Sequence, residues 1–186
     1  VGSDDGLIHL TKDGGATWEN VTPKKMPDWM MINSIDASSF DSGTAYIAGT
    51  RYKLGDFTPY LYVTDDYGKN WKLITDGIKD EHFTRVLRSD KVNKNILYAG
   101  TETGMYISYD RGNSWNEFQK NLPIVPITDL TIKDNSLIVA TQGRSIWMID
   151  DLTVFHQLTP STDQMKLYKP KDSFRMGGAG GRKSLT

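Results

Sequence analysis

The chain of 186 residues carries 22 basic and 23 acidic side chains, and this balance gives no indication of a nucleic-acid-binding protein, which would need a clustered basic face. It contains no cysteine, which excludes disulfides and thiolate metal sites, and no apolar run approaches the roughly 18 residues of a membrane span. With 38% hydrophobic and 11% aromatic residues, it can nevertheless form a folded core.

The chain opens on residues 1–6, which have neither an initiator methionine nor the charged and apolar pattern of a signal peptide. We therefore expect the chain to be a piece of a longer protein. Any targeting signal would then lie upstream.

An eight-residue pattern occurs three times: Ser or Thr, any residue, Asp, any residue, Gly, any two residues, and Trp. The fixed residues are Thr11, Asp13, Gly15 and Trp18 in the first copy, Thr64, Asp66, Gly68 and Trp71 in the second, and Ser108, Asp110, Gly112 and Trp115 in the third. The aspartates fall 53 and 44 residues apart, a spacing typical of solenoids, propellers or arrays.

Short runs rich in Ile, Val, Tyr and Trp flank each copy, which predicts β-hairpins with the repeated pattern as their turn. Further apolar runs precede the second and third copies and follow the third. The predicted strands are 7–11 and 18–21; 31–37, 44–49, 60–64 and 71–75; 84–88, 96–100, 105–109 and 115–119; and 127–132, 136–140, 146–149 and 154–158. Four antiparallel strands in about 45 residues are the signature of a propeller blade.

The sequence therefore predicts an all-β fold: a β-propeller fragment of three to four four-stranded blades. The expected blades span about 1–22, 28–76, 82–121 and 126–159, with the first lacking its inner strands. Helix content should be close to nil. Residues 161–186 are expected to form an exit segment and a Gly-rich linker around 177–181. The remaining blades of the same chain are the expected partner, and without them the isolated fragment should melt broadly or aggregate because its strand edges are unpaired.

Folding alone explains the repeated residues. An Asp carboxylate can accept bonds from successive backbone N–H groups of a tight turn, and Gly permits a positive φ angle. The Trp is expected to pack back across its own hairpin. Identical residues on every blade cannot all lie in one asymmetric site, so we interpret them as structural rather than catalytic or metal-binding.

The repeated turns resemble the Asp-box, or bacterial-neuraminidase, repeat of sialidases, xyloglucan-hydrolase propellers and the sortilin-type receptor propeller. Residues 140–152 look like the closing-blade signature of bacterial sortilin-type propeller proteins, many loosely labelled glycosyl hydrolases, although Gln142 and Ile146 stand where that signature has His and Phe. Residues 167–172 are similar to the exit segment of that family. The resemblance implies a secreted, periplasmic or cell-surface protein and leaves open whether it is a receptor or an enzyme.

In a blade with strands A to D from the axis outward, the repeated turns join strands C and D, so we expect a ligand on the opposite face. The longest loop there, residues 51–59, offers Arg51 and Tyr52 as ligand-binding candidates; the alternative is an insertion that only caps the rim. Arg144 could bind a carboxylate or sulfate, or else pair with a nearby acid.

Glycoside hydrolysis needs two carboxyl groups at a defined separation. Acids on the loops expected on the ligand face are Asp4, Asp5, Asp28, Asp56, Asp80, Glu81 and Glu102. We name Asp56, Asp80 and Glu81 as candidates, although no motif singles out a pair. His9 and His82 have no partner at metal-ligand spacing, and we expect neither metal nor cofactor.

Two functions remain open. The first is an extracellular, sortilin-like binding or scaffold module that recognises a peptide, protein or glycan on the face opposite the repeated turns. The alternative is a secreted glycoside hydrolase that degrades a polysaccharide, with some carboxylates supplied by other blades. We favour the first because the repeated residues are structural and no unique acid/base constellation stands out.

Overall fold

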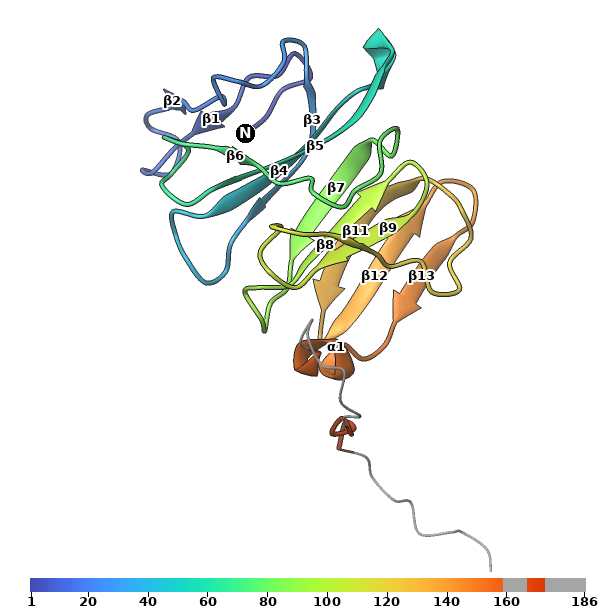
Figure 1. Ribbon diagram of the computed structural model, residues 1–186. Helices are drawn as coiled ribbons and strands as arrows, with labels where there is room; N and C mark the ends of the chain where they lie inside the picture. The colour runs from blue at the N-terminus through green and yellow to red at the C-terminus, as the bar shows by residue number, and fades with distance from the viewer. Residues whose placement is uncertain (159–166, 173–186) are drawn as a thin grey trace, which may run out of the picture.

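The computed structural model describes residues 1–158 and 167–172, whose strands form four separate antiparallel sheets (Figure 1). We call the sheets blades 1 to 4. Blade 1 contains β1 (His9–Leu10) and β2 (Glu19–Asn20). Blade 2 contains β3 (Met31–Ala37), β4 (Ala45–Arg51), β5 (Asp56–Thr64) and β6 (Lys72–Leu73), and blade 3 contains β7 (Thr84–Ser89), β8 (Leu97–Thr101), β9 (Met105–Ser108) and β10 (Asn116–Glu117). Blade 4 contains β11 (Ile127–Lys133), β12 (Ser136–Thr141) and β13 (Ile146–Ile149).

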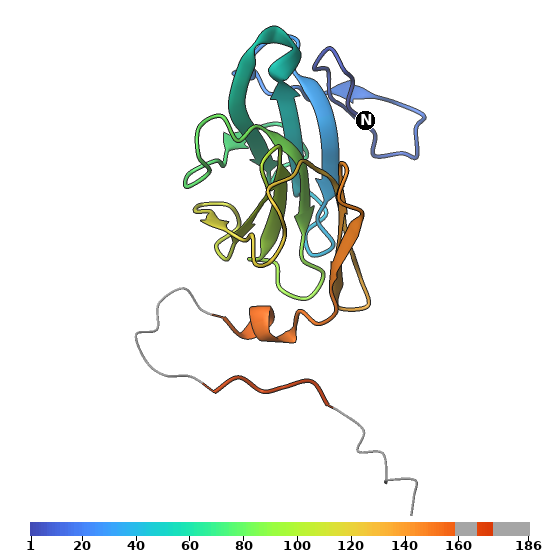
Figure 2. The ribbon, with the colours of Figure 1, turned by 90° about the vertical axis from the view of Figure 1, so that its right-hand side faces the viewer.

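Within each blade the strands pair in chain order, and the first strands of blades 2, 3 and 4 lie next to one another as β3, β7 and β11. The outer strands of blades 1 to 3 are two residues long, shorter than predicted. In the described residues the helical segments are the 3-10 turn η1 (Tyr52–Leu54) and the short helix α1 (Thr153–Gln157) (Figure 2). The prediction of an all-β fold is confirmed.

The core lies between the blades. In β8, Leu97 and Ala99 pack against blade 2, while Tyr98 on the other face packs against blade 4. Successive strand residues point to opposite faces of a sheet, so an inner strand covered on both sides must be apolar at nearly every position. This is why the middle strands of blades 2 and 3, β4, β5, β8 and β9, appear in the sequence as largely apolar runs.

The repeated turns, 11–18, 64–71 and 108–115, are called the box turns below. Those of blades 2 and 3 lie beside the turn between the first two strands of the same blade, because Tyr67 N donates to Gly43 O at 2.9 Å and Arg111 N to Asn95 O at 2.9 Å. We call this end the box face. The η1 turn lies at the opposite end, the opposite face (Figure 1).

The long loop predicted at 51–59 is largely strand. β4 runs on to Arg51 and β5 begins at Asp56, and these two residues pair across the hairpin. The hairpin closes through η1 and Gly55, whose φ of 75° lies in the left-handed region that glycine adopts at the least steric cost. The insertion is therefore a rigid extension of the sheet.

The predicted fourth strand of blade 4, residues 154–158, is wrong, since α1 takes its place. The ring of Phe155 packs edge-to-face on Phe118 with centroids 5.2 Å apart, and His156 Nε2 lies 3.0 Å from Asp90 Oδ2. Both contacts lead into blade 3, and these tertiary contacts override the strand propensity of the segment. Residues 167–172 form no strand, and the predicted Gly-rich linker at 177–181 lies outside the described residues.

Candidate functional site

Each box turn is closed by one set of hydrogen bonds. In blade 3, Ser108 Oγ donates to Asp110 Oδ1 at 2.8 Å, and Ser114 donates to the same carboxylate from its backbone N at 2.8 Å and from Oγ at 2.6 Å. Gly112 N donates to Ser108 Oγ at 2.8 Å. Thr17 and Asn70 fill the place of Ser114 in the other two turns. These carboxylates are occupied in holding the turn together.

The tryptophans of the second and third box turns reach the preceding blade. Trp115 Nε1 donates to Ile74 O at 2.7 Å, and Trp71 Nε1 donates to Val21 O at 2.7 Å. The expectation that each Trp packs across its own hairpin is wrong for these two; Trp18 alone follows it, donating to Gly15 O at 3.1 Å. The box turns thus join neighbouring blades.

On the opposite face, the innermost strand of each of blades 2, 3 and 4 carries a β-bulge near its start. The ladder skips one residue between Ile32 and Ser34, between Thr84 and Val86, and between Ile127 and Asp129. The extra residues are Asn33, Arg85 and Thr128, all polar. Bulges re-aim side chains next to functional sites, and here they place three polar residues at the opposite-face end of the inner strands.

A hollow of about 220 Å³ lies on the same face between blades 1 and 2. Its lining residues are Asp4, Trp29, Met31, Thr50, Arg51, Tyr52, Lys53 and Leu54. Trp29 is 69% exposed and holds a φ of 60°, which is uncommon for a non-glycine residue, and Leu54 is 58% exposed. An exposed indole beside an exposed leucine offers an apolar contact with polar groups around it.

Arg51 and Asp56 form the charged centre of the hairpin beside this hollow. Arg51 Nη1 lies 2.7 Å from Asp56 Oδ2, and the same oxygen accepts a bond from Tyr60 OH at 2.8 Å. Burial works to raise the pKa of Asp56, but hydrogen bonds from Thr58, Tyr60 and Arg51 outweigh it and lower the pKa to about 2. Asp56 therefore stays ionised at neutral pH and does not fit the role of a proton donor.

Tyr52 joins the hairpin to blade 3. Its ring stacks on Phe83 with centroids 5.2 Å apart, and Arg85 lies over both rings, 5.7 Å from the centroid of Tyr52. Arg85 is in turn paired with Glu102 at 2.6 Å. The hairpin is thus fixed by aromatic packing, and its ligand-binding candidates are already held in place before any ligand binds.

The remaining candidates lie apart from this hairpin. Asp80 and Glu81 are exposed on the loop between β6 and β7, and Glu81 holds a φ of 68°. Arg144 is exposed on the hairpin between β12 and β13 in blade 4, where its Nη1 donates to Gly143 O at 3.0 Å. The structure brings together Arg51, Tyr52 and Asp56, and leaves Asp80 and Glu81 on the loop between blades 2 and 3 and Arg144 on blade 4.

Two residues that the sequence analysis passed over are prominent. Trp29 is one, and the sequence hides it because it directly precedes the apolar residues Met30, Met31 and Ile32 and reads as the start of the same strand. The other is Arg88 in β7, which donates to Ser34 Oγ of blade 2, and to Leu130 O at 2.9 Å and Asp129 Oδ1 at 2.8 Å of blade 4. One side chain therefore links the inner strands of three blades.

The described part of the chain gathers no group of three or more His, Asp or Glu side chains that could hold a metal ion. His82 instead contacts Tyr106 OH through Nδ1 at 2.8 Å. Within 1–158 and 167–172, no helix has the length and apolar character needed to cross a membrane.

Comparison with known proteins identifies the family and the fold of the chain. The family model Sortilin-Vps10, described as "Sortilin, neurotensin receptor 3", matches residues 59–175. A search of curated proteins gave no match. Solved structures with similar folds include "YCF48 bound to D1 peptide", at 20% identity and a TM-score of 0.59, over 80% of this chain and 46% of that one.

Two further structures show the same fold. YCF48 from Cyanidioschyzon merolae matches at 17% identity and a TM-score of 0.53, over 78% of this chain and 47% of its own. The GH74 xyloglucanase from Xanthomonas campestris matches at 16% identity and a TM-score of 0.57, over 80% of this chain and 26% of its own. The chain thus spans less than half the length of each structure. The prediction of a partial β-propeller is confirmed.

Proposed function

Because the chain belongs to the Sortilin-Vps10 family, we propose that it forms part of an extracellular propeller that binds a peptide or protein segment on the opposite face, the face away from the box turns. The exposed Trp29 beside the rigid hairpin of β4 and β5 carries this proposal. Exposed tryptophans next to arginines are typical of the anchors that dominate protein interfaces. A structure of similar fold, YCF48, was solved with a bound peptide.

The hairpin suits binding because it is rigid. Arg51 is held by Asp56 and by Asp28 O, to which its Nε donates at 3.0 Å, and Tyr52 is held by Phe83. A pre-ordered surface loses little conformational entropy when a ligand binds. The mixture of apolar and charged groups in the hollow suits a peptide that inserts one apolar side chain and pairs polar groups around it.

The test uses the full-length protein and an array of defined synthetic peptides. Peptides that bind specifically should lose about tenfold or more in affinity with Trp29→Ala, as expected for an interface anchor. Trp18→Ala is the matched control, because Trp18 is also exposed but lies in a box turn on the other face. Equal losses from both variants, or from neither, would overturn the proposed site.

A glycoside hydrolase remains the alternative, and the GH74 likeness in fold is the observation that favours it. Of the named carboxylates, the exposed Asp80 and Glu81 are free to take part, whereas Asp56 is ion-paired. Release of reducing ends from a polysaccharide panel by the full-length protein, abolished by Asp80→Ala, would replace the binding proposal.

A further inference from the structure

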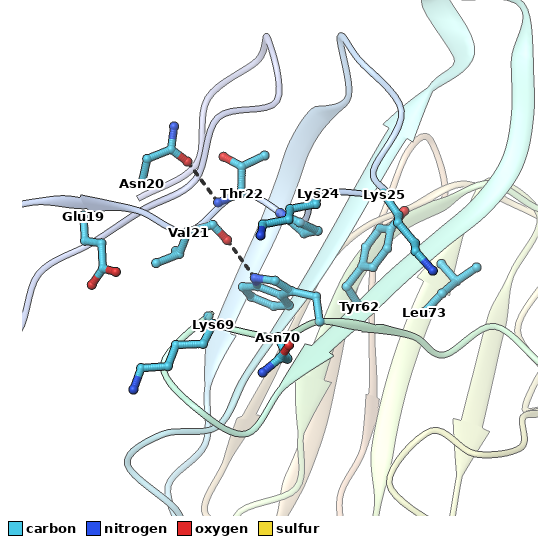
Figure 3. Close-up of a pocket in the computed structure, with 13 residues that line it drawn as sticks. Glu19, Asn20, Val21, Thr22, Lys24, Lys25, Tyr62, Lys69, Asn70 and Leu73 are labelled. Atoms are coloured by element: carbon cyan, nitrogen blue, oxygen red, sulfur yellow. Dashed lines mark hydrogen bonds between the residues drawn. The ribbon is translucent and has the colours of Figure 1, made fainter.

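A second cavity lies at the outer rim between blades 1 and 2 and has a volume of about 720 Å³ (Figure 3). One wall is formed by residues 19–25, from β2 and the segment after it, and the other by residues 68–71 of the second box turn and by Leu73 of β6. Tyr62 also lines it. The cavity, called the rim groove below, shares no lining residue with the hollow near Trp29.

The corresponding junction between blades 2 and 3 is closed. There, Trp115 N donates to Asp76 O at 2.8 Å, and Gly77 lies so near that a Cβ on it would sit 2.3 Å from Trp115 O. Trp115 is accordingly only 4% exposed.

In blade 1, Lys25 stands where blade 2 has Gly77. The two loops align because they contain the same turn: Met26 N donates to Pro23 O at 3.0 Å, and Ile78 N donates to Thr75 O at 3.0 Å. Lys25 and Gly77 each directly precede the donor residue of that turn. A lysine side chain cannot be accommodated as close to the next box turn as Gly77 lies to Trp115. The rim groove is therefore a consequence of the sequence of this loop.

Tyr62 has an unusual environment for a buried tyrosine. It is 6% exposed, and its ring packs with Ile8, Val21 and Ile47. Among the described residues, no group forms a hydrogen bond with its hydroxyl, which faces the rim groove. Burial raises the pKa of Tyr62 to about 12, so the hydroxyl keeps its proton and can donate.

Blade 3 shows what Tyr62 lacks. Tyr106 occupies the equivalent place, since Tyr62 pairs with Leu73 as Tyr106 pairs with Glu117. The hydroxyl of Tyr106 contacts His82 Nδ1 at 2.8 Å and accepts from Lys79 N at 3.4 Å. In the loop before blade 2 the matching residues are Met30, whose side chain has no nitrogen, and Pro27, which has no N–H. Neither can replace the missing partners.

The charges around the rim groove have one dominant sign. Lys24 and Lys25 lie on the blade 1 wall and Lys69 on the blade 2 wall (Figure 3), and all three are exposed. None of them is in an ion pair within the described residues, and Glu19 is the single acid among the lining residues. Three cations thus face a single acid across the rim groove, an excess of positive charge that complements a ligand with negatively charged acceptors.

We propose that the rim groove binds an extended acidic peptide, with one carboxylate accepting the hydroxyl proton of Tyr62 and neighbouring carboxylates facing the three lysines. A peptide is favoured because β2 and β6 are the outermost strands of their sheets. Their outer edges leave backbone groups available to an extended chain. This site goes beyond the proposed function and does not involve Trp29.

The experiment measures binding of a fluorescent, end-capped hexaglutamate peptide to the full-length protein by anisotropy, with hexaglutamine as the neutral probe. Hexaglutamate should bind, more weakly at higher salt, and hexaglutamine should not. Tyr62→Phe should weaken binding about tenfold, the loss expected for a hydrogen bond to a charged group, without lowering the Tm. The double variant Lys24→Gln, Lys25→Gln should weaken it similarly.

Matched controls separate this site from the rest of the molecule. Tyr106→Phe should leave hexaglutamate affinity unchanged but lower the Tm, because it removes a bond made within the protein. Trp29→Ala should also leave it unchanged, so that this proposal and the proposed function can fail independently. Absence of hexaglutamate binding, full affinity in Tyr62→Phe, or binding of dextran sulfate in preference to hexaglutamate would overturn the proposal.

Discussion

At the scale of single residues, the aspartates of the box turns are held as anions. Hydrogen bonds from Thr17 lower the pKa of Asp13, and the backbone N and side chain of Asn70 lower that of Asp66. Partial burial works to raise the pKa of Asp110, but hydrogen bonds from Ser114 and Ser108 outweigh it, so this pKa is also below its usual value. Each of the three box turns thus depends on its own ionised aspartate.

These shifts predict acid instability. A carboxyl whose pKa is lower in the folded than in the unfolded state contributes stability that is present above its ordinary pKa of about 4 and is lost as the pH falls through the folded value. The Tm should therefore be nearly constant from about pH 7 to 5 and fall below about pH 4. Asp110→Asn, which cannot titrate, should have a lower Tm at pH 7 and a smaller acid-induced fall. An unchanged pH profile in this variant would contradict the assignment.

The glycines of the box turns allow a second prediction. Gly112 has a φ of 85°, and a Cβ there would lie 2.6 Å from Ile74 Cδ1 of the preceding blade. Gly14 has a φ of 72° but faces open space. Gly112→Ala should therefore reduce the free energy of unfolding by about 1 to 3 kcal/mol more than Gly14→Ala, because it adds a clash between blades to the backbone strain. Urea unfolding of the two variants measures the difference, and equal losses would show that a Cβ at position 112 causes no clash with Ile74 that affects stability.

Residue-level roles were predictable from the sequence where they are local. The Asp and Gly of the box turns act on groups within four residues, so the repeated pattern was sufficient to interpret them. The partners of Trp71 and Trp115 lie on another blade, and no local pattern shows them. The position of Thr17, Asn70 and Ser114 was missed because three different residue types perform one role there.

At the scale of elements, α1 closes blade 4 by binding blade 3. Asp90, whose side chain is buried, accepts from Val92 N at 2.7 Å and Asn93 N at 2.8 Å, and lies 3.0 Å from His156 Nε2. The turn after β7 and the helix after β13 are thereby held together. A helix of five residues is too short to be stable alone, so this contact is a main reason for its presence.

His156→Ala should loosen α1 selectively. The amides of His156 and Leu158, which bond to Leu152 O and Phe155 O, should exchange faster with solvent, equivalent to a loss of about 1 to 3 kcal/mol of local stability. His9→Ala, in β1, is the control and should leave this exchange unchanged. Unchanged protection of α1 in His156→Ala would show that packing of Phe155 is sufficient.

The sequence predicted most inner strands to within about two residues, because strands buried on both faces form unmistakable apolar runs. It did not predict the extended hairpin of β4 and β5, since the polar and aromatic residues there resemble a loop. It also could not predict the bulges at Asn33, Arg85 and Thr128, because a bulge is a property of pairing between two strands. The opposite face was therefore identified by topology, and its geometry only by the structure.

At the scale of the whole molecule, the blades are joined differently at their two ends. On the box face, the box turns bond to the preceding blade through Trp71 and Trp115. Near the axis, Arg88 connects the inner strands of blades 2, 3 and 4. The opposite face carries the bulges, the extended hairpin and exposed Trp29, and there Tyr52 stacks on Phe83 and joins blade 2 to blade 3.

The most direct test of binding at the opposite face is hydrogen–deuterium exchange of the full-length protein with and without a peptide ligand found by the array. We predict that the ligand protects residues 27–30 and 51–57 on the opposite face and leaves the box turns at 64–71 and 108–115 unchanged. Protection of the box turns, with no change around Trp29 and η1, would contradict the account.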